Sequence, residues 1–109
     1  MSDTLTKDCK VLLDIICKEY NRRTKSGIPR REAIYFADSS TICTMFLPQQ
    51  TVEDVTDTCW ELCRHNYLDC HPGDNLANDI QLTDKAIAQY ENRIKNGLET
   101  AVNIFSKLK

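Results

Sequence analysis

The sequence lacks the residue patterns on which most enzyme sites depend. Its 109 residues include only two histidines and three glycines, and they form neither a glycine-rich loop for phosphate nor a sharp turn that exposes a nucleophilic serine. Cys70 directly precedes His71, but adjacency in the chain does not orient the two side chains for base catalysis. The sequence therefore predicts neither an enzyme nor a bound cofactor.

Long hydrophobic runs are also missing. The longest stretch without a charged residue is 39–52, which contains Ser, Thr, Gln and Pro, whereas about 20 apolar residues are needed to cross a bilayer. The opening MSDTLTKD is polar and unlike a signal peptide. We therefore expect no membrane contact and a cytoplasmic location. Six cysteines are then expected as reduced thiols, namely Cys9, Cys17, Cys43, Cys59, Cys63 and Cys70.

Positive charge is scarce in the middle of the chain. Residues 1–50 hold eight basic and six acidic residues, residues 51–79 hold one and seven, and residues 80–109 hold five and three. The net charge of −2 therefore conceals a middle segment at −6, which is one basic minus seven acidic residues. Such a segment repels nucleic acid and attracts basic surfaces.

Apolar residues recur at steps of three and four over most of the chain, which is typical of amphipathic helices. With 41% hydrophobic residues, the chain suits one domain around a single core. Gly27 and Pro48 are helix stops, and Pro29 suits a first helical turn. The spacing predicts helices over about 4–24, 30–37, 41–47, 51–65, 83–95 and 98–108.

Polar side chains mark several of these helix ends. Asp38 stands where it can cap the helix that follows it. Thr51 and Asp54 approximate a capping box, in which each side chain bonds a free backbone N–H at the helix start. Thr83 is expected to cap another helix, and Asn66 suits the left-handed residue that often ends one.

Two short strand-like pieces, 67–70 and 80–82, follow the helix over 51–65. The run HPGDN at 71–75 is rich in turn formers, and 76–79 complete the loop between the pieces. The sequence thus predicts a hairpin over about 67–82. The expected fold class is mainly α with a small antiparallel β-hairpin.

This order of elements resembles the winged helix-turn-helix class, with extra N- and C-terminal helices. In that class 41–47 corresponds to the first helix of the motif, 51–65 to the recognition helix and 67–82 to the wing. The run IQLTDKAIAQYEN is similar to the end of such wings, and the tail 98–109 is similar to that of small YjcQ-like bacterial proteins. The resemblance implies a small regulatory protein that binds double-stranded DNA through its recognition helix.

DNA binding of this kind needs cations near phosphates. One basic cluster lies at the junction of the first two expected helices, and a polar group at the start of the recognition helix is placed to read base edges. The alternative is a solvated helix end whose cations suit the helix dipole. The phosphate candidates are Arg22, Arg23, Lys25, Arg30 and Arg31, and the base-edge candidates are Gln49, Gln50 and Thr51.

Acidic residues argue against a DNA reader. The would-be recognition helix carries several carboxylates and no basic residue before Arg64, and the wing carries three carboxylates and no basic residue. These residues are Glu53, Asp54, Asp57 and Glu61 in the helix, and Asp69, Asp74 and Asp79 in the wing. The alternative function is a protein–protein interaction module that does not bind DNA and that uses the acidic 51–79 region for a basic partner.

The cysteines raise the question of a metal. Cys59 and Cys63 stand one helical turn apart, Cys70 and His71 follow in the hairpin, and these four residues are the candidate zinc ligands. The spacing matches no common zinc signature, and Cys59 and Cys63 also fall on the apolar stripe of their helix. The alternative is buried structural thiols.

The last expected helix suggests a second copy of the chain as partner. Its apolar stripe includes Leu98, Val102, Phe105 and Leu108. These residues either pack against the first helix within one subunit or pack across a two-fold axis to form a homodimer. Both arrangements bury the stripe.

Overall fold

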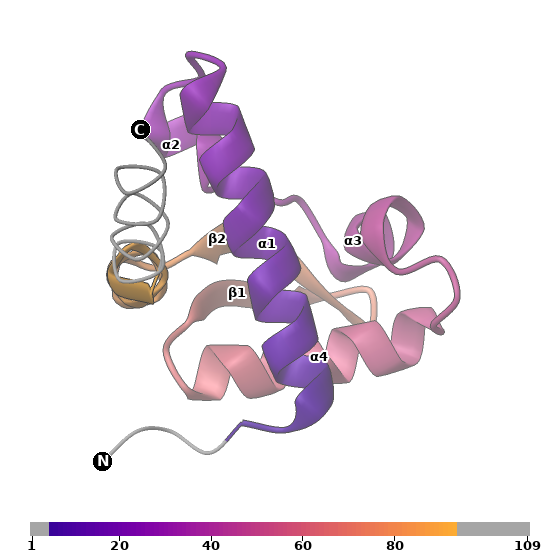
Figure 1. Cartoon of the computed structure of the whole chain (residues 1–109). Coiled ribbons are helices and arrows are strands. Elements are labelled where there is room, and N and C mark those ends of the chain that lie inside the picture. Colours follow the sequence, from indigo (N-terminus) through magenta and orange to yellow (C-terminus); the bar gives the residue numbers. More distant parts are fainter. Residues whose placement is uncertain (1–4, 94–109) are drawn as a thin grey trace, which may run out of the picture.

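Helix α4 (Val52–Arg64) is the centre of the fold, because it contacts α1 (Lys7–Lys25), α3 (Ser39–Phe46) and both hairpin strands (Figure 1). The computed structural model describes residues 5–93. A short helix, α2 (Arg30–Ala33), follows α1, and β1 (Leu68–Gly73) and β2 (Leu76–Leu82) form the hairpin. The chain is helical again from 84 to 93. The expectation of a mainly α fold with a small antiparallel hairpin is therefore confirmed, while the helix expected over 98–108 lies outside the described residues.

Helix α1 forms because its apolar residues fall on one side and its two ends are capped. Thr6 accepts the backbone N–H of Cys9 at the start, and Gly27 with a φ of 94° follows the C-cap Ser26. A positive φ is tolerated by glycine without steric cost. The buried stripe of α1 consists of Cys9, Leu12, Ile16, Cys17 and Tyr20.

The N-caps expected for the next helices, Asp38 and Thr51, are present, but only the Thr51 half of the expected capping box forms in the described structure. The Asp38 carboxylate accepts the N–H of Thr41 at 2.8 Å and starts α3, and the Thr51 hydroxyl accepts the N–H of Asp54 at 3.1 Å and starts α4. Helix α4 ends just before Asn66, which has the expected left-handed φ of 66°. Local polar chemistry thus sets the boundaries of both helices.

The helix expected over 30–37 is wrong beyond Ala33. Residues 34–37 leave the helix because their backbone pairs with the outer edge of β2, with Tyr35 opposite Gln81, Ile34 still in the right-handed helical region and Ala37 at a φ of 59°. Phe36 donates its N–H to Ile80, Ile80 donates to Ala37, and Leu82 donates to Ile34, at 2.8 to 3.0 Å. These three bonds add a third, short chain segment beside the hairpin.

The hairpin covers about the residues expected, but its strands are longer and its loop is shorter than predicted. The ladder runs from Leu68 opposite Leu82 to Gly73 opposite Leu76, so most of the predicted loop 71–79 is strand. Only Asp74 and Asn75 form the turn, with φ values of 52° and 60°. Two positive φ values in a two-residue loop are the signature of the turn type whose twist matches that of paired strands.

One apolar core joins all of these elements. Its fully buried side chains come from all four labelled helices and the hairpin, and none of the described cysteines is in a disulfide. The largest include Leu12, Ile16, Ile42, Leu62, Leu68 and Ile80. Among residues 5–93, no helix is long and apolar enough to span a membrane.

Candidate functional site

The exposed side of α4 carries a row of carboxylates, which we call the acidic stripe: Glu53, Asp54, Asp57 and Glu61. Positions three and four apart lie on one side of a helix, so the four residues are neighbours on its surface. The first three are exposed and Glu61 is half-buried. None of the four forms an ion pair within residues 5–93, and only Glu61 accepts a side-chain hydrogen bond, a long one of 3.5 Å from Thr6.

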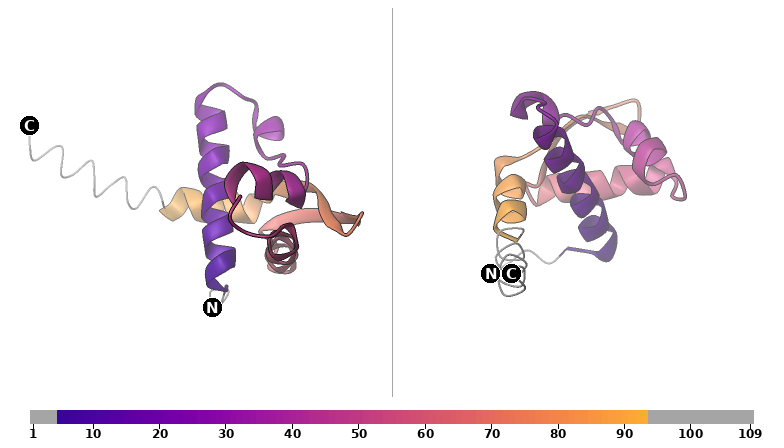
Figure 2. Two further views of the ribbon diagram at one scale, coloured as in Figure 1. Left: turned by 90° about the vertical axis from the view of Figure 1, so that its right-hand side faces the viewer. Right: turned by 45° about the horizontal axis from the view of Figure 1, so that its top comes forward.

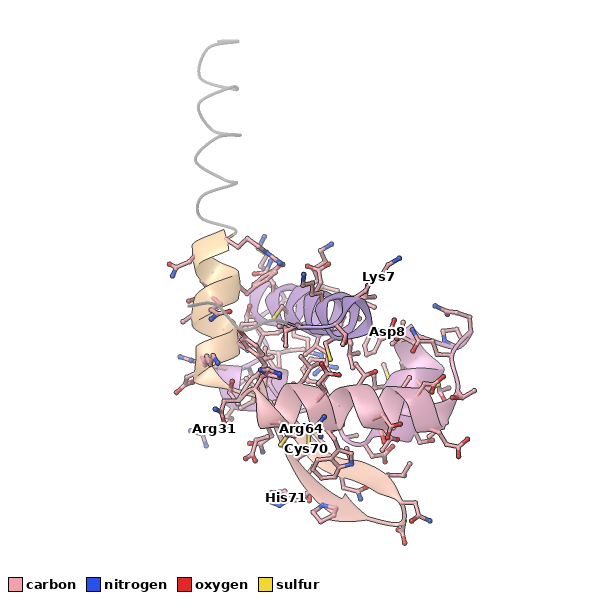
Figure 3. All side chains as sticks on the ribbon, turned by 90° about the horizontal axis from the view of Figure 1, so that it is seen from below. Lys7, Asp8, Arg31, Arg64, Cys70 and His71 are labelled. Atoms are coloured by element: carbon pink, nitrogen blue, oxygen red, sulfur yellow. The ribbon has the colours of Figure 1, made fainter. Side chains whose placement is uncertain are left out.

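The hairpin adds further negative charge. Asp69, Asp74 and Asp79 are exposed, and none of them has an ion pair in the described part of the chain. Asp79 accepts a hydrogen bond of 3.4 Å from the hydroxyl of Tyr35. Figure 3 shows Arg64, the only basic residue of 51–79, at the end of α4 that lies next to the hairpin.

The basic cluster is divided by the fold, and Arg23 is its most enclosed member. Its guanidinium donates to Glu19 at 2.8 Å and to the backbone oxygens of Tyr35 and Ala33 at 2.8 and 3.2 Å. The same group lies over the ring of Phe36, 4.3 Å from the centroid. Arg23 therefore holds the end of α1 to the segment 34–37 and has few donors left for a phosphate.

Two other members also have acidic partners. Arg22 donates to both oxygens of Glu19 at 2.9 and 2.7 Å, and Arg30 pairs with Asp84 at 2.8 Å. Hydrogen bonds from Arg22 and then from Arg23 lower the pKa of Glu19 to about 2. Both side chains remain largely exposed, however, at 64% for Arg22 and 59% for Arg30.

Lys25 and Arg31 are the remaining members of the cluster. Both are exposed and neither has an ion pair among residues 5–93. They are therefore the two cations of this cluster that stay available to a ligand without the loss of an internal bond.

The base-edge candidates lie in the turn between α3 and α4. Gln49 is exposed, whereas the backbone oxygen of Gln50 accepts the thiol of Cys43 at 3.2 Å and the hydroxyl of Thr51 caps α4. This turn lies at the right of Figure 1, while the end of α1 and α2 lie at the top. The basic cluster and the polar turn are thus separate surfaces.

The candidate zinc ligands do not converge. Cys59 and Cys70 are buried and Cys63 is half-buried, whereas His71 is exposed on the strand. Figure 3 shows Cys70 beside α4 and His71 farther out along the hairpin. No three His, Cys, Asp or Glu side chains in 5–93 are placed to share a metal ion.

Burial keeps the thiols of Cys59 and Cys70 protonated. It raises the pKa of Cys59 to about 12 and that of Cys70 still higher. These positions belong to the core that α4 and β1 share, where cysteine behaves as a small apolar residue.

An apolar hollow beside α3 was not predicted. It has a volume of about 130 Å³ and is bordered by Tyr35 and Met45, which are 44% and 59% exposed. The sequence analysis assigned Tyr35 to a helix, and the run Ile34-Tyr35-Phe36 shows no alternation of apolar and polar residues that would have indicated a strand.

No known protein family, curated protein or solved structure matches this chain.

Proposed function

We propose that this chain is a protein-interaction module on a winged-helix frame, and that the acidic stripe of α4 binds a basic segment of a partner protein. The frame is supported by the succession of α3, a short turn, α4 and the β1–β2 hairpin, which is the order that the resemblance implies. In that frame α4 stands in the place of a recognition helix.

The acidic stripe carries the proposal. A helix that enters the major groove brings its exposed side chains close to two rows of phosphates, and carboxylates there are repelled. The stripe presents Glu53, Asp54 and Asp57 to solvent without counter-charges in the described structure. The same arrangement favours lysine and arginine side chains of a protein, because complementary charge speeds association and fixes orientation.

The basic cluster supports the choice of protein over DNA. Arg23 is committed to Glu19 and to two backbone oxygens, so the number of free cations is smaller than the sequence suggests. Phosphate binding through Lys25 and Arg31 alone would give a weak dependence on salt, since each cation that binds a phosphate contributes about one to the slope.

Fluorescence anisotropy with two labelled probes tests the proposal: a lysine-rich peptide and a mixed-sequence DNA duplex, each at low and at higher salt. We expect the peptide to bind and the duplex not to bind. The double substitution Glu53→Gln with Asp57→Asn removes two negative charges from the acidic stripe. It should weaken peptide binding by about threefold to tenfold, because two charge contacts are lost.

Glu32→Gln is the matched control, because Glu32 is an exposed carboxylate on α2, outside the stripe. It should leave peptide affinity unchanged. The proposal fails if the duplex binds and if Lys25→Gln with Arg31→Gln abolishes that binding, since the chain would then be a DNA-binding protein. It also fails if neither probe binds at low salt.

A further inference from the structure

Two thiols lie side by side where the end of α4 meets β1. Cys63 is in the last turn of α4 and is half-buried, and Cys70 is in β1 with 8% of its surface exposed. The left view of Figure 2 shows the hairpin beside α4. The chain reverses at Asn66, and Tyr67 donates its N–H to the oxygen of Leu62 at 2.9 Å. This bond holds the start of β1 against the last turn of the helix.

Strand geometry turns the Cys70 side chain toward α4. Side chains alternate along a strand, so Leu68 and Cys70 are buried while Asp69 between them is exposed, and Figure 3 shows Cys70 beside α4. Burial raises the pKa of the Cys70 thiol, and the thiols of Cys59 and Cys63 raise it further, Cys63 in part through a hydrogen bond between the two side chains. Cys63 and Cys70 are therefore in contact in the reduced chain.

We propose that Cys63 and Cys70 are a site of oxidative modification, at which a peroxide converts the two thiols into a reversible disulfide. Among residues 5–93, which include all six cysteines, Cys63 alone is not buried. A small peroxide therefore reaches Cys63 first. The site goes beyond the proposed function, because neither thiol belongs to the acidic stripe.

The reaction has two steps. The Cys63 sulfur attacks one oxygen of hydrogen peroxide, so that an S–O bond forms, the O–O bond breaks, and the other oxygen leaves with the thiol proton as water. The Cys70 sulfur then attacks the Cys63 sulfur, the S–S bond forms, and the S–O bond breaks. The oxygen leaves with the Cys70 proton as a second water. The two sulfurs together lose the two electrons that the peroxide gains.

Cys70, and not Cys59, is the partner of Cys63. Cys59 precedes Cys63 by four residues on the same helix, and Cβ atoms at that spacing are about 5–6 Å apart, whereas a disulfide needs about 3.5–4.5 Å. Cys70 lies on a separate element that can move toward the helix. Its attack is intramolecular, and this proximity compensates for the raised pKa of its thiol.

The disulfide joins the end of α4 to β1 and closes the loop 63–70. A closed loop restricts the unfolded chain, so the folding equilibrium constant of the oxidised chain should be higher by about tenfold or more. In a reducing compartment such a bond forms only transiently, during oxidation. The pair thus makes the junction of α4 with the hairpin sensitive to peroxide.

Oxidation of the full native chain with hydrogen peroxide tests the proposal, followed by alkylation of the remaining thiols, trypsin digestion and mass spectrometry. Trypsin cuts after Arg64, so the disulfide joins peptide 32–64 to peptide 65–85. We expect this joined peptide, its loss after dithiothreitol, and fragments that place the bond on Cys63. The oxidised chain should also unfold at a higher urea concentration than the reduced chain.

Cys59→Ala is the matched control, because Cys59 lies on the same helix and in the same tryptic peptide as Cys63. It should still give the joined peptide, whereas Cys63→Ser should not. If Cys59→Ala does not fold, the fragments of the wild-type peptide decide between the two sulfurs.

Four results overturn the proposal. The first is oxidation of Cys63 to a sulfinic acid without a joined peptide. The second is a bond on Cys59, and the third is a bond between two chains, seen as a doubled mass on a non-reducing gel. The fourth is a native chain in which no thiol reacts until urea unfolds it.

Discussion

The hydroxyl oxygens of Ser39 and Thr56 lie 2.7 Å apart inside the core, and the Ser39 oxygen also accepts the backbone N–H of Ala77 at 3.2 Å. Ser39 has no exposed surface. One buried hydroxyl therefore joins α3, α4 and β2, the three elements that orient the acidic stripe relative to the hairpin. Because buried polar groups need partners, the position tolerates few other residues.

Ser39→Ala should lower the free energy of unfolding by about 1–3 kcal/mol, because the N–H of Ala77 and the hydroxyl of Thr56 then lose a buried partner. Urea unfolding followed by the fluorescence of the single tryptophan measures the change. Ser40→Ala, at the half-buried neighbour, is the control and should change stability by about 0.5 kcal/mol or less. Equal effects of the two substitutions would contradict the role of Ser39.

Arg23→Lys should lower the free energy of unfolding by about 1–2 kcal/mol, because an ammonium cannot reproduce the planar set of bonds that the guanidinium makes to Glu19, Tyr35 and Ala33. Thermal unfolding by calorimetry measures the loss. Arg22→Lys is the control: its side chain is 64% exposed and the effect should be clearly smaller. If Arg22→Lys is the more destabilising change, Arg23 does not hold α1 to the segment 34–37.

The segment 34–37 shows where the sequence was insufficient to predict the backbone. Ile34, Phe36 and Ala33 have apolar spacing that fits a helix, and nothing local reveals that Ile80 and Leu82, more than 40 residues later, bond to this backbone. Long-range pairing overrides local preference. The caps were different, because Thr51 and Asp38 bond to backbone only three residues away, and such contacts can be read from the sequence.

The candidate site, like the fold, was predictable from the sequence only in part. The carboxylates of α4 follow from composition and helical spacing, and their exposure agrees with the apolar stripe on the other side of the helix. The contacts that occupy the Arg23 guanidinium were not predictable. They depend on the ring of Phe36 and on the backbone oxygens of Ala33 and Tyr35. The turn after α1 and helix α2 bring these groups back to the end of α1.

Acid should weaken the fold through Glu19. Its pKa is lowered from 4.5 to about 2 in the folded chain by Arg22 and Arg23. A depressed folded pKa stabilises the fold fully above the unfolded value and progressively less as pH falls from about 4.5 to about 2. Urea midpoints between pH 6 and pH 2 measure this. Glu19→Gln should lower stability at pH 6 and flatten the acid slope, whereas Glu32→Gln should leave the slope as it is. A wild-type slope in Glu19→Gln would show that other carboxylates are responsible.

Thiol reactivity should single out Cys63. Burial raises the pKa of Cys17 to about 12 and that of Cys59 to about 12, so few thiolates form at those positions near neutral pH. Brief treatment of the native chain with iodoacetamide at pH 8, followed by peptide mass spectrometry, should find Cys63 modified first, and the Cys63→Ser variant should lack this fast adduct. After unfolding in guanidinium all six cysteines should react. Rapid native modification of Cys17 would mean that the core opens at α1.

The turn residue Asn75 should be replaceable by glycine with a gain in stability. Asn75 has a φ of 60° and follows Asp74 with a φ of 52°, and L-residues other than asparagine and aspartate adopt this region at a cost of about 1 kcal/mol or more. Asn75→Gly should therefore raise the free energy of unfolding by about 0.5 kcal/mol, and Asn75→Ala should lower it by about 1 kcal/mol.

Gln81→Ala, at an exposed strand position with ordinary backbone angles, controls for the loss of a polar side chain. Because the hairpin ladder begins at this turn, protection of the β1 and β2 amides from hydrogen exchange should rise in Asn75→Gly and fall in Asn75→Ala. A change in the same direction in both variants would mean that backbone conformation at Asn75 does not limit hairpin stability.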